Sequence, residues 1–103
     1  MQKDYGGVIW TNHALLRMEE RKVKQGDAWA TWKNPSNSKY DPKKGAWVYR
    51  RVYGNEEIEV VAKKNEKNQW LIISVWSNIL HTNKAFEPKR SLLQSFLKFL
   101  FNM

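Results

Sequence analysis

The sequence predicts an α+β domain in which two N-terminal helices pack on a three- to four-stranded antiparallel sheet and a C-terminal helix follows. Three observations predict it: helical spacing of apolar residues early in the chain, alternation of apolar and polar residues in the middle, and helical spacing again near the end. Helices grouped before strands are typical of the α+β class. A length of 103 residues suits a single domain, since it supports one hydrophobic core.

The first predicted helix covers residues 12–21, and a second, short helix ends before Pro35. Thr11 or Asn12 is a suitable N-cap, because its side-chain oxygen can accept a hydrogen bond from a free amide of the first turn. The second helix has to end there because the residue before a proline is driven out of the helical conformation. Residues 35–45 collect Pro, Ser, Asn, Asp and Gly, and this composition predicts a loop.

Three strands are expected after that loop, at residues 46–53, 58–64 and 69–77. Arg50 and Arg51 are consecutive in the first strand, so their side chains point to opposite faces of the sheet. A two- or four-residue loop at Gly54-Asn55 places Arg51 on the same face as Ile58, whereas a three-residue bulged loop places Arg50 there. The sequence leaves both registers open.

The third strand has an aliphatic face and a mixed face. We expect the aliphatic set to face the core: Leu71, Ile73 and Val75. The mixed set consists of Trp70, Ile72, Ser74 and Trp76. Rings and a hydroxyl beside arginines suit unstacked RNA bases and their phosphates. The alternative is that these aromatic residues are ordinary strand formers.

The composition favours a polyanionic partner. The formal net charge is +8, from 18 Lys plus Arg against 10 Asp plus Glu, which suits binding to nucleic acid, an acidic protein or an anionic membrane surface. Cysteine is absent and there are 2 histidines, so we expect no disulfide, no metal site and no cofactor. No run approaches the ~20 apolar residues of a transmembrane helix, and we expect a cytoplasmic protein.

Three basic side chains recur at every fourth position of the first helix: His13, Arg17 and Arg21. At about 100° per residue, Arg17 lies roughly 40° and Arg21 roughly 80° around the helix from His13. This strip borders the apolar face, where a cleft forms easily. The alternative is a solvated helix face with local pairing to Glu19 and Glu20.

Two motifs give the sequence a family resemblance: the helix pattern His13-x-x-x-Arg17-Met18-x-x-Arg21 and the strand triplet Ser74-Val75-Trp76. With a short second helix and a meander between these motifs, residues 8–78 resemble a bacterial domain family of unknown function. That family is allied to RelE-like toxins in the barnase, EndoU, colicin and RelE nuclease superfamily. The resemblance implies a RelE- or barnase-like fold. It also implies metal-independent cleavage of RNA, by attack of the 2′-hydroxyl on its own phosphate.

The implied reaction needs a proton acceptor, a proton donor and cations around the phosphate. His13 is the candidate base or acid, since histidine titrates closest to neutrality, and His81 is a second candidate acid. The candidate catalytic residues are His13, Arg17, Arg21 and Arg51. The candidate substrate-binding residues are Arg50, Tyr49, Ser74 and Trp76. No carboxylate stands out as a base, because charge balance at a hairpin accounts for Glu56, Glu57 and Glu59.

Two other functions stay open. The domain could bind RNA or DNA without cleaving it, or it could be an interaction protein that uses its C-terminal helix. That helix, at residues 88–101, lies beyond the resemblance, so we expect it to be an addition to the domain. It carries more apolar side chains than one core-facing stripe needs. An antitoxin or a second copy of the chain could bind through Leu92, Leu93, Phe96, Phe99 and Leu100.

Overall fold

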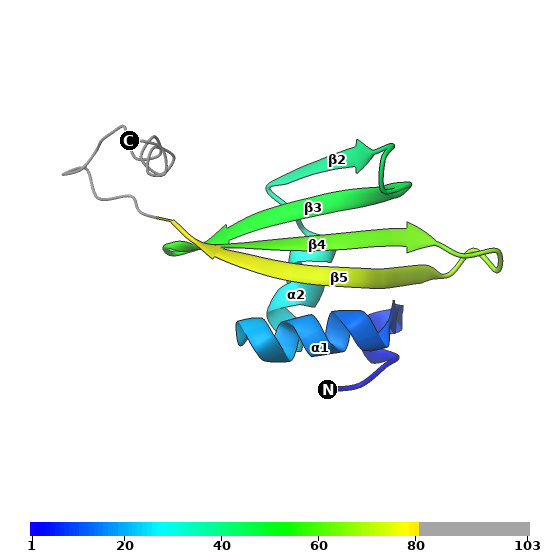
Figure 1. Ribbon diagram of the computed structural model, residues 1–103, viewed down its shortest axis with the longest axis horizontal. Helices are drawn as coiled ribbons and strands as arrows, with labels where there is room; N and C mark the ends of the chain where they lie inside the picture. Colours follow the sequence, from blue (N-terminus) through cyan, green and yellow to red (C-terminus); the bar gives the residue numbers. More distant parts are fainter. Residues whose placement is uncertain (81–103) are drawn as a thin grey trace.

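Two α-helices and five strands make up residues 1–80, which the computed structural model describes (Figure 1). In chain order the elements are a 3₁₀ helix Tyr5–Gly7, β1 Ile9–Trp10, α1 Asn12–Arg21, α2 Gln25–Lys33, β2 Asn37–Asp41, β3 Ala46–Tyr53, β4 Glu56–Lys64 and β5 Trp70–Ile79. The helix predicted at 88–101, with its partner-binding residues, and the candidate acid His81 lie outside the described residues.

All five strands form one sheet in the order β1-β5-β4-β3-β2. β2 to β5 pair antiparallel, whereas β1 runs parallel to β5, so the sheet is mixed. Figure 1 shows α2 behind the sheet and α1 alongside β5. α1 packs against β5, and α2 packs against β4 and β3. We call the face that α2 covers the helix-side face and the other the open face.

The predicted fold is therefore corrected, for residues 1–80, to two helices and a five-stranded mixed sheet in place of a three- to four-stranded antiparallel one. β1 has only two residues, which is too few to show an alternation pattern. β2 lies in the segment predicted as a loop. The sequence does not reveal this strand, because its side chains are mostly polar and exposed. Main-chain pairing with β3 holds β2 in the sheet without a buried side-chain face.

Thr11 joins the start of α1 to β5. Its Oγ1 accepts a hydrogen bond from the Ala14 amide at 3.1 Å, so Thr11 is the N-cap, one of the two positions that the sequence predicts. The same hydroxyl donates to the Ile72 carbonyl oxygen at 3.1 Å, and the Thr11 amide donates to that oxygen at 3.1 Å. One residue therefore caps the helix and anchors it to the sheet.

A two-residue turn at Gly54-Asn55 sets the register of β3 and β4. Gly54 has a φ of 61°, in the left-handed region that glycine adopts without steric cost. The turn pairs Arg51 with Ile58 on the helix-side face and Arg50 with Glu59 on the open face. Of the registers that the sequence leaves open, the two-residue one is formed, and Arg50 is the arginine on the open face.

β5 contains a β-bulge in its middle. Val61 of β4 pairs with Ser74, and Ala62 pairs with Ile72, so Ile73 is an extra residue without a partner of its own. The alternation of side chains along β5 therefore changes phase at Ile73.

This phase change corrects the predicted division of β5 into an aliphatic and a mixed face for the residues up to Ile73, whereas Val75, Ser74 and Trp76 lie on the predicted faces. Ile72 and Val75 are both fully buried in the helix-side core, three positions apart. Trp70 packs against the same core. Ser74 and Trp76, which follow the bulge, lie on the open face.

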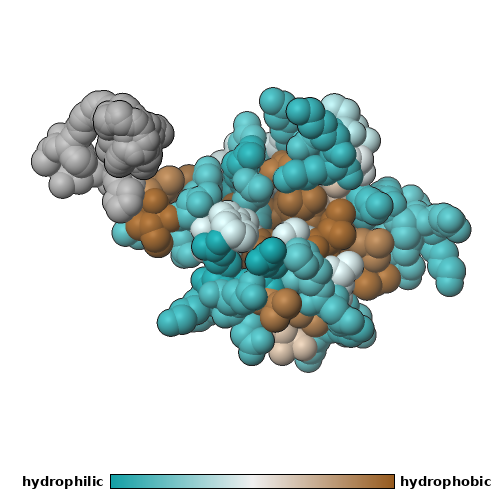
Figure 2. Space-filling model, in the orientation of Figure 1, coloured by the Kyte–Doolittle hydropathy of each residue, from teal (hydrophilic) through white to brown (hydrophobic). Residues whose placement is uncertain are grey.

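Apolar side chains pack on both faces of the sheet. On the helix-side face the buried cluster includes Trp10, Ala14, Met18, Ile58, Val60, Ile72 and Val75. A smaller cluster on the open face consists of Ala46, Val48 and Val61, with Ile73 packed against it. Figure 2 views the open face and shows hydrophobic side chains in the middle of the molecule between hydrophilic margins. The open face therefore has an apolar floor and a polar rim.

Replacing Thr11 with alanine should lower the free energy of unfolding by about 1–2 kcal/mol, because the N-cap and the hydroxyl's bond to Ile72 are both lost. Urea denaturation followed by circular dichroism measures the change. Thr11→Ser keeps the hydroxyl and should stay close to the wild type. Equal stability of Thr11→Ala and the wild type would contradict the anchoring role.

Candidate functional site

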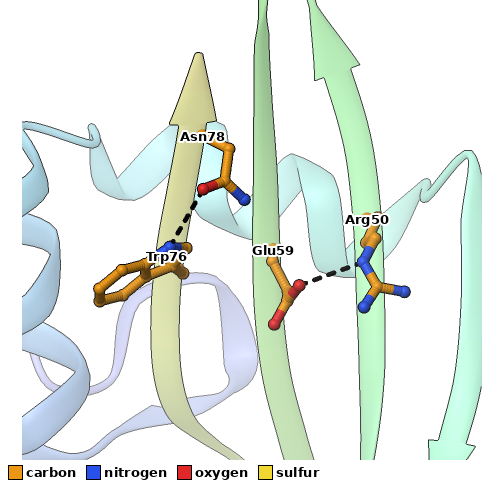
Figure 3. A network of polar contacts seen from close by, with 4 residues as sticks. All are labelled: Arg50, Glu59, Trp76 and Asn78. Carbon is orange, nitrogen blue, oxygen red and sulfur yellow. Dashed lines mark hydrogen bonds and ion pairs between the residues drawn. The ribbon is translucent and has the colours of Figure 1, made fainter. Parts of the chain in front are cut away.

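Two arginines of α1 stack on one tryptophan of β5. Arg21 Cζ lies 3.2 Å from the centroid of the Trp76 ring, and Arg17 Cζ lies 5.6 Å from it. Figure 3 shows the ring extending sideways from β5, and its Nε1 donates to Asn78 Oδ1 at 3.3 Å. Residues four apart are neighbours on a helix, which lets both arginines reach the same ring. We call Arg17, Arg21 and Trp76 the edge cluster.

A shallow depression adjoins the edge cluster on the open face. Its volume is about 500 Å³, and it is lined by Lys44, Glu59, Val61, Ser74, Trp76 and Asn78. Arg50 stands on the next strand and donates from Nε to Glu59 Oε1 at 3.1 Å, as Figure 3 shows. The structure therefore brings five of the predicted site residues to one region: Arg17, Arg21, Arg50, Ser74 and Trp76.

Glu59 is a site residue that sequence reasoning misses. In the sequence it is one of three glutamates near a hairpin, where charge balance explains it. In the sheet it pairs with both Arg50 and Trp76, which places a carboxylate in the wall of the depression. The register of the β3–β4 turn would have identified it, since a two-residue loop puts Glu59 opposite Arg50.

The two arginines of the edge cluster differ in their charge partners. Arg17 forms an ion pair with Glu20 at 3.0 Å, between side chains that are 37% and 48% exposed. Solvent screens such a pair, so it contributes little to stability. Within residues 1–80, no carboxylate forms an ion pair with Arg21. The solvated-face alternative therefore describes Arg17 in part, whereas Arg21 has no such pair among residues 1–80.

His13 lies one helical turn before Arg17 on α1, and its side chain is exposed. The spacing extends the basic strip of α1 beyond the edge cluster toward the start of the helix. An exposed imidazole is accessible to a substrate that lies along this strip.

Arg51 and Tyr49 are not at this site. Both lie on the helix-side face, because β3 alternates and Arg50 occupies the open face. Arg51 donates to the Asn34 carbonyl at 3.3 Å and lies over the Tyr53 ring at 5.1 Å, which places it at the end of α2. Tyr49 packs among other aromatic rings, and burial raises the pKa of its phenol.

Metal-binding clusters and membrane-spanning helices are both absent from residues 1–80. No group of three or more His, Cys, Asp or Glu side chains in this part is arranged to hold a metal ion. None of its helices is both long enough and apolar enough to cross a membrane.

Residues 10–77 match a protein family that is described as a domain of unknown function (DUF4258). The match covers more than half of the chain and includes α1, α2 and the edge cluster. No curated protein and no solved structure matches the chain.

A double-mutant cycle between Arg21 and Trp76 should give a coupling energy of about 0.5–1 kcal/mol, as expected for a partly exposed cation–π pair. The measurement is the free energy of unfolding of Arg21→Ala, Trp76→Ala and the double variant. The matched control pairs Arg21→Ala with Tyr53→Ala, whose ring stacks with a different arginine. Additive effects at Arg21 and Trp76 would show that the stack contributes no energy.

Proposed function

The chain belongs to the DUF4258 family. From the geometry of its edge cluster we propose that it binds single-stranded RNA, and from the resemblance of its helix and strand motifs that it is a RelE-like toxin-type domain. The observation that carries the proposal is the stack of two guanidinium groups on Trp76 beside an open depression. Such a cluster presents positive charge, hydrogen-bond donors and flat surfaces in one place.

These groups match the parts of an unpaired nucleotide. A guanidinium that stacks on a ring through its flat face keeps its N–H groups available at its edge. Those donors can bind two phosphate oxygens at once. Unpaired bases stack on aromatic rings and on arginine planes, which a duplex does not offer. Single-stranded nucleic acid therefore suits the edge cluster better than a duplex.

The depression adds groups that favour RNA over DNA. Ser74 lies in its wall, and a serine hydroxyl can both donate to and accept from a ribose 2′-hydroxyl. Lys44 supplies a further cation for a phosphate. The formal net charge of +8 supports attraction of a polyanion to the molecule as a whole.

A second candidate function is metal-independent cleavage of the bound RNA, and the position of Glu59 favours it. Cleavage by the neighbouring 2′-hydroxyl needs a base to take the hydroxyl proton, cations to neutralise the phosphorane and an acid for the leaving oxygen. Glu59 is a candidate base in the wall of the depression. Arg17 and Arg21 are the candidate cations, and His13 on the same strip is the candidate acid.

Binding of a labelled single-stranded RNA should weaken at least about tenfold when salt is raised from about 50 to about 200 mM, as expected when about three phosphates are contacted. Arg21→Ala should weaken binding and reduce the slope of log affinity against log salt by about 0.7. Glu19→Ala, an exposed change on the same helix, is the control and should not weaken it. Fluorescence anisotropy measures both quantities. A flat salt response would contradict the proposed function.

If the second function holds, His13→Ala and Glu59→Gln should each slow RNA cleavage by about 10²- to 10⁴-fold in the presence of EDTA. Removal of the exposed His13 side chain should change stability by no more than about 0.5 kcal/mol. Gel analysis of the products, with detection of 2′,3′-cyclic phosphate ends, reports the reaction. A cleavage rate that is unchanged in both variants would show that neither residue is catalytic. RNA binding by the wild type without any cleavage would contradict the second function and leave RNA binding as the proposed function.

A further inference from the structure

Five aromatic rings form a continuous row on the helix-side face of the sheet, away from the edge cluster. The row runs Trp32, Trp70, Tyr49, Trp47 and Tyr40, with centroids of neighbouring rings 5.9, 6.3, 6.5 and 5.6 Å apart. It starts at Trp32 of α2 and Trp70 of β5, which both pack against the core, and it ends at Tyr40 of β2. The row therefore leads from the core to the surface.

The outer end of the row is open to solvent. Trp47 is 41% exposed and Tyr40 is 47% exposed, and their rings meet edge to face. Single exposed hydrophobic residues are common on protein surfaces and need no explanation. Trp47 also lies beside the partly buried Tyr49, so the two adjoining exposed rings continue a packed row and form a platform at its outer end.

Lysines lie beside two of the inner rings of the row. Lys64 Nζ lies 5.5 Å from the Trp70 centroid, and Lys33 Nζ lies 6.0 Å from the Trp32 centroid. An open hollow of about 400 Å³ is lined by Tyr40, Gly45, Trp47, Lys63, Lys64 and Trp70. None of these lining residues is acidic. We call Tyr40, Trp47, Trp70 and Lys64 the aromatic shelf.

We propose that the aromatic shelf is a second RNA-binding subsite, at which unpaired bases stack on Trp47 and Tyr40 while Lys64 binds a flanking phosphate. Aromatic rings beside cations, with no carboxylate in the lining, complement a polyanion with flat bases. A cationic ligand is disfavoured by the lysines, and a neutral one makes no use of them.

The inference rests on the proposed function for the identity of the ligand, but the two surfaces are separate. Trp70 and Trp76 lie on opposite faces of the sheet and six residues apart along β5, which corresponds to about 20 Å at about 3.3 Å per residue. A change at one surface therefore leaves the contacts of the other intact.

The test is fluorescence anisotropy of a labelled single-stranded oligouridylate with variants of the full chain. Loss of one stacked base costs about 1–3 kcal/mol, so Trp47→Ala should weaken binding by about 5- to 150-fold at about 1.4 kcal/mol per factor of ten. Trp47→Phe keeps a ring and should retain most of the affinity. Lys64→Gln should reduce the salt slope by about 0.7, as for one phosphate contact on a single strand.

The matched control is Lys24→Gln, which removes the same charge from an exposed position on α2's N-terminal side. It should bind like the wild type. If Trp47→Ala loses structure by circular dichroism, Lys64→Gln decides, because that side chain is exposed.

The outcomes separate the two proposals. Wild-type affinity in both Trp47→Ala and Lys64→Gln, with weakened binding in Trp76→Ala, would overturn the shelf and leave the edge cluster as the RNA site. Weakened binding in Trp47→Ala with wild-type affinity in Trp76→Ala would support the shelf and overturn the edge cluster. Absence of RNA binding by the wild type would overturn both.

Discussion

The bulge at Ile73 is the constraint on which the candidate site depends. Burial of a large aliphatic side chain contributes roughly 1.5–3 kcal/mol, and both Ile72 and Val75 are fully buried on the helix-side face. An uninterrupted strand cannot bury both, because residues three apart point to opposite faces. The extra residue resolves the conflict, because it lets Ile72 join the core while Ser74 and Trp76, on either side of Val75, keep the open face. The packing of the core therefore decides which β5 side chains a ligand can reach.

The same point of β5 also positions α1. The Thr11 hydroxyl lies 3.1 Å from the Ile72 carbonyl oxygen and 3.3 Å from that of Ile73, so the helix starts beside the bulge. From Thr11 to Arg21 the helix advances about 15 Å at about 1.5 Å per residue. From Ile72 to Trp76 the strand advances about 13 Å at about 3.3 Å per residue. The two lengths agree, which explains why Arg21 and Trp76 meet although 55 positions separate them in the sequence.

The sequence predicts those features that depend on neighbouring residues. It does not predict those that depend on pairing between segments far apart in the chain. The start of α1 is predictable because a cap needs only Thr11 and the amides that follow. β2 is not, since its hydrogen bonds to β3 replace the apolar pattern that reveals a strand. The pairing of Arg17 and Arg21 on one helix face follows from spacing, whereas their contact with Trp76 depends on the packing of α1 against β5. Arg51 is the clearest example of a position that the sequence does not determine. The register of the β3–β4 turn places it on the helix-side face, where it reaches the end of α2.

The ion pair between Arg50 and Glu59 connects the fold to the choice between binding and cleavage. Its side chains are 37% and 20% exposed, and an ion pair in such a partly solvated position contributes only about 0–1 kcal/mol to stability. A carboxylate beside a phosphate site also opposes anion binding, so pure RNA binding is better served without Glu59. Arg50 offsets this repulsion by neutralising the carboxylate when no substrate is present. If the proposed cleavage holds, Glu59 has a second role besides its ion pair with Arg50, because a carboxylate in this depression can take the proton of a 2′-hydroxyl.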